Sequence, residues 1–364
     1  MSNSQLLAGV RVIDLSQYIP GPFATRQLAD LGAEVIKVEP PGGDPMRVFM
    51  HRDDGDVSPI YRHLNRGKRI CSLDLKSDAG REILRGLLED ADILLESFRP
   101  GVLARLGFDR DSLEAINPRL IHCALSGYGQ QGPYAQRSGH DINYCAQTAQ
   151  GIVSGTAERP VVGFPPIADH VSALQAGVTI LAALHARERS GRGTFLDLSI
   201  AESILAWQYL PLLGESSERA ATILNGGAAC YNIYRCVDER FVSLGAIESR
   251  FWENFCNALR QPDWVARQFE TMPQQDLVAE VAAVIESRPW TYWRKLLDDV
   301  DCCFEVLCDP DELAAHPQFE HRRGLDENGP RYAAWIDGQP LTLADEPEMV
   351  DSAQNLQWIS PSSS

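Results

Sequence analysis

The first half of the chain alternates short apolar runs with segments in which apolar residues recur every three or four positions. Few polar residues interrupt the runs, which is typical of strands buried on both faces of a parallel sheet. We predict strands at 10–15, 33–39, 69–75, 91–97 and 119–126. Helices at 21–32 and 78–90 are predicted between them. This order predicts an α/β fold with a large Rossmann-like parallel sheet.

The second half of the chain has a different pattern. A strand at 193–200 and a helix around 201–213 are followed by two strands around a turn at Val237–Arg240, and then by mostly helical sequence from 253 to 300. We therefore predict a large α/β domain at 1–214 and a smaller α+β domain at 215–325. The weakly patterned tail, 326–364, is predicted to complete the large domain by wrapping over its surface.

Charge narrows the classes of partner. The net charge of −17 repels phosphate polymers and anionic membranes, which disfavours nucleic-acid and membrane binding. A small anionic ligand in a local basic pocket stays compatible with this charge. The longest apolar stretch, 173–184, is too short to span a bilayer and predicts a buried core helix.

Several motifs are absent from the sequence. The first predicted strand is not followed by GxGxxG, and no GxxxxGK[ST] occurs, which excludes the usual dinucleotide and P-loop fingerprints. The nine scattered cysteines lack CxxC spacing, and the N-terminus lacks a basic segment followed by a long apolar run. We expect reduced thiols, a cytoplasmic protein and no metal site.

Three side chains are candidates for acid–base chemistry: His140 in "SGHDINY", Asp169 in "IADH" and Glu248 in "GAIE". Removing a proton from the carbon beside a thioester needs a base of near-neutral pKa, which histidine supplies. Returning the proton to the other face needs an acid, and a carboxyl in an apolar pocket can keep its proton. A further carboxylate could fix the histidine tautomer.

Each candidate also has a purely structural interpretation. His140 could pair with Asp141 in a surface loop. Asp169 could be the N-cap of a helix that begins at His170, and Glu248 could cap the next predicted helix. The residues alone leave both interpretations open.

Five blocks carry a family resemblance: residues 7–44, 73–108, 117–134, 186–203 and 245–252. In this order they resemble the class III CoA-transferases (the CaiB/BaiF superfamily), which include the α-methylacyl-CoA racemases. "GHDINY" (139–144) and the stretch 226–251 resemble the racemase branch. The resemblance implies an acyl-CoA racemase in which His140 and Asp169 are the two bases and Glu248 supports the histidine.

The same resemblance implies how coenzyme A binds. CoA would arrive as part of the substrate, with no permanently bound cofactor. Its adenine and phosphates would lie near residues at the sheet edge, namely Leu73, Lys76, Ser97, Phe98, Arg99 and Arg105. Pro40 stands where the family usually has a CoA-contacting arginine, so we expect Lys37, Arg47 or Arg69 to replace it. Members of the family form interlocked homodimers, and we expect one here.

Two other functions stay open. In the transferase branch, the aspartate that matches Asp169 attacks the thioester, giving a mixed anhydride and then an aspartyl-CoA thioester. "DHVSALQAG" (169–177), with His170, replaces the glycine run of racemases and keeps this alternative. Transferases generally lack the histidine of "GHDINY", which favours racemisation. A non-catalytic CoA-thioester binding protein would not need the three candidate side chains.

Overall fold

The computed structural model describes residues 6–50, 57–214, 216–341, 345–350 and 356–359. The chain divides into two compact units, each described by itself. The large unit comprises Met1–Tyr144, Pro165–Ile204 and His316–Ser364, and the small unit comprises Cys145–Phe164 and Leu205–Ala315.

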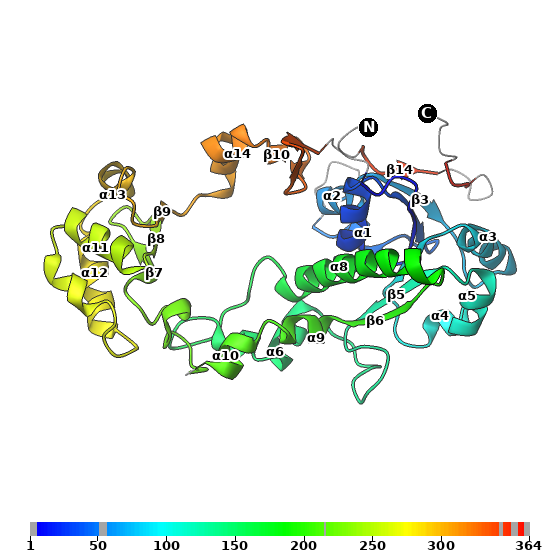
Figure 1. The fold of residues 1–364 in the computed structure, drawn as a ribbon, viewed down its shortest axis with the longest axis horizontal. Coiled ribbons are helices and arrows are strands. Elements are labelled where there is room, and N and C mark those ends of the chain that lie inside the picture. Colours follow the sequence, from blue (N-terminus) through cyan, green and yellow to red (C-terminus); the bar gives the residue numbers. More distant parts are fainter. Residues whose placement is uncertain (1–5, 51–56, 215, 342–344, 351–355, 360–364) are drawn as a thin grey trace. The chain divides into compact units, whose positions relative to one another are not determined.

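The large unit is built on a seven-stranded parallel sheet in the order β14-β3-β2-β1-β4-β5-β6 (Figure 1). The strands are β1 (Arg11–Asp14), β2 (Glu34–Glu39), β3 (Lys68–Ser72), β4 (Ile93–Glu96), β5 (Ile121–Ser126), β6 (Phe195–Ser199) and β14 (Glu348–Met349). Every strand predicted in the first half is present, and the predicted parallel α/β fold is confirmed. The strand order reverses between β1 and β4, which is where open α/β sheets place their ligands.

Helices cover both faces of this sheet. Helices α1 (Pro20–Asp30) and α8 (Ile167–Ser190) lie along one face, whereas α3 (Asp78–Glu89), α4 (Val102–Arg105) and α5 (Arg110–Ile116) cover the other (Figure 1). The second group shares a core with inward-facing strand residues such as Ile13, Ile36 and Leu94. A shorter helix, α2 (Pro59–Asn65), precedes β3, and α6 (Asp141–Gln147) follows β5.

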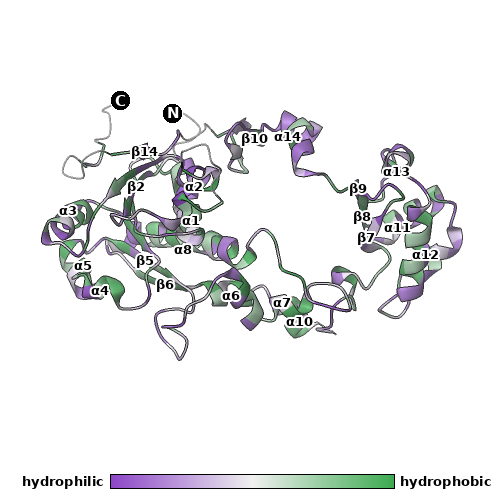
Figure 2. Cartoon of the chain, turned by 180° about the vertical axis from the view of Figure 1, so that it is seen from behind, coloured by the Kyte–Doolittle hydropathy of each residue, from purple (hydrophilic) through white to green (hydrophobic). Residues whose placement is uncertain are grey.

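Helix α8 is longer than the apolar stretch from which it was predicted. With 24 residues it is long and apolar enough to cross a membrane. Core helices of soluble proteins meet the same criterion of length and composition. Figure 2 shows the hydrophobic residues along it. The expected burial holds for Ala173, Ala176 and Ile180, but Leu174 is 46% and Val178 65% exposed. The prediction of a buried core helix is therefore right for one face only.

The small unit contains a three-stranded antiparallel sheet of β7 (Tyr231–Arg235), β8 (Phe241–Gly245) and β9 (Phe304–Val306). Its longer helices are α11 (Ser249–Ala258), α12 (Gln275–Glu286) and α13 (Trp290–Leu297). Trp252, Trp264 and Trp293 form the centre of its core. The two predicted strands are present, whereas β9 was not predicted, because three residues give too short a pattern.

The helix predicted around 201–213 is broken. It consists of α9 (Ile200–Leu205) and α10 (Tyr209–Leu213). Pro211 lacks an amide hydrogen, and its ring would collide with the carbonyl four residues earlier, so a helix cannot run unbroken into this position.

The tail returns to the large unit. Strand β14 adds to the edge of β3, and the indole of Trp358 donates a hydrogen bond of 3.1 Å to the carbonyl of Leu87. Leu356 is buried in the same core cluster.

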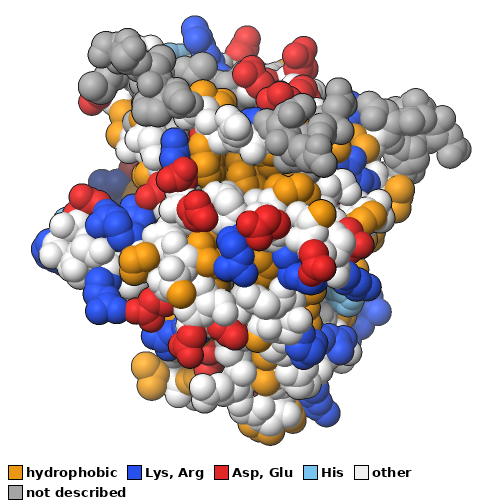
Figure 3. Space-filling view, turned by 90° about the vertical axis from the view of Figure 1, so that its right-hand side faces the viewer, with side chains coloured by type: hydrophobic (Ala, Val, Ile, Leu, Met, Phe, Trp, Pro, Cys, Tyr) orange, Lys and Arg blue, Asp and Glu red, His pale blue; other side chains and the backbone are white. Residues whose placement is uncertain are grey.

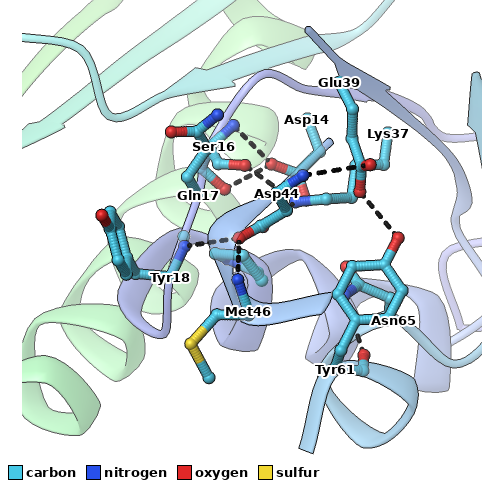
Figure 4. Close-up of polar contacts among 12 residues, drawn as sticks. Asp14, Ser16, Gln17, Tyr18, Lys37, Glu39, Asp44, Met46, Tyr61 and Asn65 are labelled. Carbon is cyan, nitrogen blue, oxygen red and sulfur yellow. Dashed lines mark hydrogen bonds and ion pairs between the residues drawn. The ribbon is translucent and has the colours of Figure 1, made fainter. Parts of the chain in front are cut away.

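Charged side chains are buried where α1 packs on the sheet (Figure 4). The ammonium of Lys68 lies 3.1 Å from Asp14, and that of Lys37 lies 3.0 Å from Asp44. Burial alone would raise the pKa of Asp14, but Lys68 and Lys37 hold it well below its ordinary value. Burial lowers the pKa of Lys68 to about 8. These charges are therefore tolerable only as pairs.

We predict that Lys68→Met lowers the free energy of unfolding by about 3–5 kcal/mol, because it leaves the Asp14 carboxylate buried without its nearest cation. The measurement is denaturant unfolding followed by circular dichroism. Arg192→Met, which breaks the exposed pair with Glu114, is the control and should cost less than about 1 kcal/mol. Equal effects of the two variants would contradict the prediction.

Candidate active site

A pocket of about 310 Å³ opens in the large unit beyond the carboxyl ends of β1, β4 and β5. It therefore lies at the point where the strand order reverses. Both His140 and Asp169 line it, together with Tyr18, Ser97, Arg99 and Tyr144. Two of the three predicted catalytic residues thus share one pocket.

The backbone of His140 is fixed by its neighbours. Tyr144 donates a hydrogen bond of 2.8 Å from its hydroxyl to the carbonyl of Gly139, and Asn143 accepts one of 3.0 Å from the His140 amide. A Cβ at Gly139 would lie 2.8 Å from the Tyr144 ring, so only glycine fits beside this tyrosine. The His140 side chain is exposed toward the pocket.

Asp169 lies in the first turn of α8, which begins two residues earlier. The carboxylate of Asp141 accepts hydrogen bonds from the amides of Ala168, at 2.6 Å, and Asp169, at 3.2 Å. The N-cap position belongs to Pro166, so the interpretation of Asp169 as the N-cap is wrong, and its own carboxyl is left for the pocket. This role of Asp141 leaves no local signal in the sequence, because the contact with Ala168 spans 27 residues.

The pKa of the Asp169 carboxyl is raised to about 7, mainly by burial and further by the charge of Asp141. A carboxyl with this pKa is present in both protonation states near neutral pH. It can therefore donate a proton in one direction of a reaction and accept one in the other.

His170 has a structural contact. Its Nδ1 lies 2.5 Å from the carbonyl oxygen of Pro166, and its ring packs edge-on against Phe23 of α1, with centroids 4.9 Å apart. The residue that departs from the racemase pattern thus joins α8 to α1 beside Asp169.

Glu248 occupies the N-cap position of α11 in the small unit, but its side chain makes no capping hydrogen bond. The pKa of the Cys303 thiol is raised mainly by burial and further by the charge of Glu248, which lies nearby. The support of His140 by Glu248 stays a prediction.

The residues predicted to contact CoA differ in their access to a ligand. Ser97, Phe98 and Arg99 follow β4 directly and line the pocket. Lys76 follows β3 and Arg105 ends α4, and both side chains are exposed but are not among the residues that line the pocket. The other predicted contact, Leu73, has its side chain in the core, so only its backbone could meet a ligand.

Of the three cations expected to replace the arginine missing at Pro40, Lys37 is fully buried and pairs with Asp44, so it is wrong as a phosphate ligand. Arg69 pairs with Glu34 but keeps part of its side chain exposed, and its role stays a prediction. Arg47 bonds to Glu39 and stacks on Tyr61 but keeps part of its surface exposed. On the face of the large unit in Figure 3, basic and acidic side chains are interspersed, so any phosphate site there is local.

Within the described parts of the chain, no group of three or more His, Cys, Asp or Glu side chains is placed to hold a metal ion.

We predict that Asp141→Asn lowers the pKa of Asp169, because it removes the charge that opposes ionisation of Asp169. The measurement is a ¹³C-NMR titration of the aspartate carboxyls, with Asp169→Asn used for assignment. Asp109→Asn is the matched control, since Asp109 accepts from a helix-start amide in α5 and is not among the groups that raise this pKa. An unchanged or higher Asp169 pKa in the Asp141 variant would refute this.

A second prediction concerns stability. A carboxyl whose pKa is higher in the folded than in the unfolded chain binds more protons when folded, so its contribution to stability is lost as pH rises from about 4 to about 7. Asp169→Asn, which cannot ionise, should therefore gain about 1 kcal/mol or more over the wild type at pH 8. At pH 4 the gain should vanish. Urea unfolding at both pH values measures it, and a gain that is the same at both would rule out the ionisation as its cause.

Comparisons with known proteins agree on a family. A family model described as CoA-transferase family III matches residues 7–352. Over 326 residues the chain is 33% identical to the human α-methylacyl-CoA racemase, covering 87% of this chain and 81% of the racemase. It is 31% identical over 363 residues to the acetyl-CoA:oxalate CoA-transferase of Acetobacter aceti, covering 96% and 92% of the two chains. A solved CaiB/BaiF family protein from Brucella suis, 26% identical, superposes with a TM-score of 0.80 over 95% of this chain and 96% of that one.

Proposed function

The chain belongs to CoA-transferase family III, and from that premise we propose that it is an acyl-CoA racemase that inverts the α-carbon of a 2-methylacyl-CoA thioester. The observation that carries this proposal is the shared pocket. His140 and a carboxyl of near-neutral pKa, Asp169, both line it.

The reaction needs one base and one acid at a time. Neutral His140 removes the α-proton, and the electron pair of the C–H bond moves onto the thioester oxygen to give an enolate. Protonated Asp169 then gives its proton to the opposite face of the carbon, which inverts it. In the reverse direction the Asp169 carboxylate removes the proton and protonated His140 returns one, so atoms and charge balance in both directions.

The pKa of Asp169 supports this exchange of roles. A carboxyl with an ordinary pKa of about 4 would be almost fully ionised at neutral pH and a poor acid. Burial and Asp141 raise its pKa to about 7, so the acid form and the base form are both populated.

Substrate binding and assembly follow the family resemblance. We propose that Ser97, Phe98 and Arg99 hold CoA at the mouth of the pocket, with Lys76 and Arg105 on its phosphates. Glu248 is proposed to hold the second nitrogen of His140 in a homodimer. Support comes from apolar side chains that a single chain leaves bare, such as Phe164, which is 90% exposed, and Leu213, which is 84% exposed. Sedimentation equilibrium should give a dimer, and an active monomer at high dilution would contradict this assembly.

CoA transfer through Asp169 is the second candidate, because a relative of this chain is an oxalate CoA-transferase. The Asp169 carboxylate would attack the thioester carbonyl and expel the CoA thiolate, leaving a mixed anhydride of Asp169 and the acyl group. The thiolate would then attack the aspartyl carbonyl, giving an aspartyl-CoA thioester and releasing the first acyl group as its free carboxylate. An incoming carboxylate would then take the CoA. His140 is not needed for these steps.

We predict that the protein washes deuterium into the α-position of a 2-methylacyl-CoA in D₂O without any added acid. His140→Ala should slow racemisation by a factor of about 10² or more, the usual contribution of a positioned base. Proton NMR of the α-hydrogen and methyl signals measures both exchange and racemisation. His185→Ala, which removes an exposed histidine of α8, is the control and should change nothing.

The opposite pattern supports transfer. CoA moves to added oxalate or succinate, no exchange occurs, and hydroxylamine modifies Asp169 during turnover. His140→Ala then leaves the activity largely intact. That set of results would refute the racemase assignment.

A further inference from the structure

Tyr18 has a strained backbone at the wall of the pocket. Its φ of 65° lies in the left-handed region, which is costly for a side chain with a Cβ. The residue is 45% exposed, so packing in a core does not explain this conformation. An outlier of this kind, beside a candidate catalytic residue, calls for a functional explanation.

The loop that carries Tyr18 is held from several directions (Figure 4). The amide of Ser16 donates to Asp14 at 2.9 Å, and the carbonyl of Ser16 accepts from Lys37 at 2.8 Å. The amide of Tyr18 donates to Asp44 at 3.4 Å.

One further bond completes this support, from the Gln17 amide to the Ser97 hydroxyl at 3.1 Å. Three of these four partners, namely Asp14, Lys37 and Asp44, belong to the buried ion pairs beside α1. Strain persists only where the surroundings over-determine it, as they do here.

The ring of Tyr18 meets the ring of His140 edge-to-face. The centroids are 5.9 Å apart and the planes are inclined by 77°. Within the described residues, the His140 imidazole makes no hydrogen bond, and Tyr18 is its single ring partner. In the large unit, therefore, the ring contact of the imidazole comes from the strained residue.

We propose that Tyr18 is a positioning residue, whose ring holds the His140 imidazole at the angle needed for proton transfer from one face of the α-carbon. This inference rests on the proposed racemase function. The buried ion pairs fix the loop, the loop fixes the phenol ring, and the ring limits rotation of the imidazole. A base that is misplaced by a small distance loses much of its rate.

The two-base reaction provides a selective test. His140 exchanges the α-proton of one enantiomer, and Asp169 exchanges that of the other. Tyr18→Gly removes the ring and relieves the left-handed strain, since glycine adopts this conformation freely. Initial deuterium wash-in should fall about ten- to a hundredfold for the enantiomer that His140 deprotonates and stay near the wild-type rate for the other. Tyr18→Phe keeps the ring and should behave like the wild type with both enantiomers.

Stability separates this role from a structural one. Tyr18→Gly should unfold at the same denaturant midpoint as the wild type or at a higher one, although it is less active. Glu239→Gly is the matched control, because Glu239 has a φ of 68° in the exposed turn between β7 and β8. It relieves the same kind of strain and should leave exchange unchanged.

A measurement independent of activity keeps the two proposals distinguishable. In ¹H–¹⁵N NMR spectra of the histidine rings, assigned with His140→Ala, the His140 signals should shift in Tyr18→Gly and stay in place in Tyr18→Phe. If the wild type exchanges neither enantiomer, the proposed function fails and these spectra alone decide the role of Tyr18. Unshifted His140 signals in Tyr18→Gly, equal loss for both enantiomers, or equal damage by Tyr18→Phe would overturn the inference.

Discussion

The arrangement of the pocket depends on one carboxylate, that of Asp141. It follows His140 directly in the chain and accepts hydrogen bonds from the amides of Ala168 and Asp169 at the start of α8. Free amides and the helix dipole at this end favour a negative charge, so the bond is both a cap and a link. It ties the loop of His140 to the helix of Asp169. The same charge opposes ionisation of Asp169, so positioning and pKa tuning have a common origin.

A second constraint comes from the loop after β1, which also lines the pocket. The ion pairs Asp14–Lys68 and Lys37–Asp44 are fully buried. Because removing these charges from water costs about as much as their attraction contributes, the pairs do not stabilise the fold more than apolar side chains would. Their hydrogen bonds to the loop after β1 suggest a reason for keeping them, because they hold Tyr18 in a conformation that a softer loop would relax. The pocket thus combines a strained backbone with a carboxyl of raised pKa, and both are features that reduce stability in favour of chemistry.

The sequence predicts the parallel sheet well, because strands such as β4 and β5 are mostly apolar runs and helices of clear periodicity lie between the strands. A local motif and a family resemblance also indicate His140 and Asp169 as candidate catalytic residues. Other features depend on contacts between distant segments. No local signal in the sequence indicates the cap that Asp141 provides, the left-handed φ of Tyr18 or the burial of Lys37. The apolar residues of α8 predict a helix but do not indicate which of its faces is buried. Lys37 in particular looks like an ordinary cation in the sequence, whereas its partner Asp44 becomes visible only in the fold.

We propose that His140 and Asp169 act on opposite faces of one carbon. The most direct measurement follows a single turnover of one enantiomer of a 2-methylacyl-CoA that carries deuterium at the α-position, in ordinary water and with enzyme in excess. If His140 and Asp169 act in turn, the first group removes the deuterium and the second group delivers a proton that came from the solvent. Mass spectrometry then finds no deuterium in the inverted product. Inverted product that keeps the substrate's deuterium would mean that one group both removes and returns the proton, and would contradict the account.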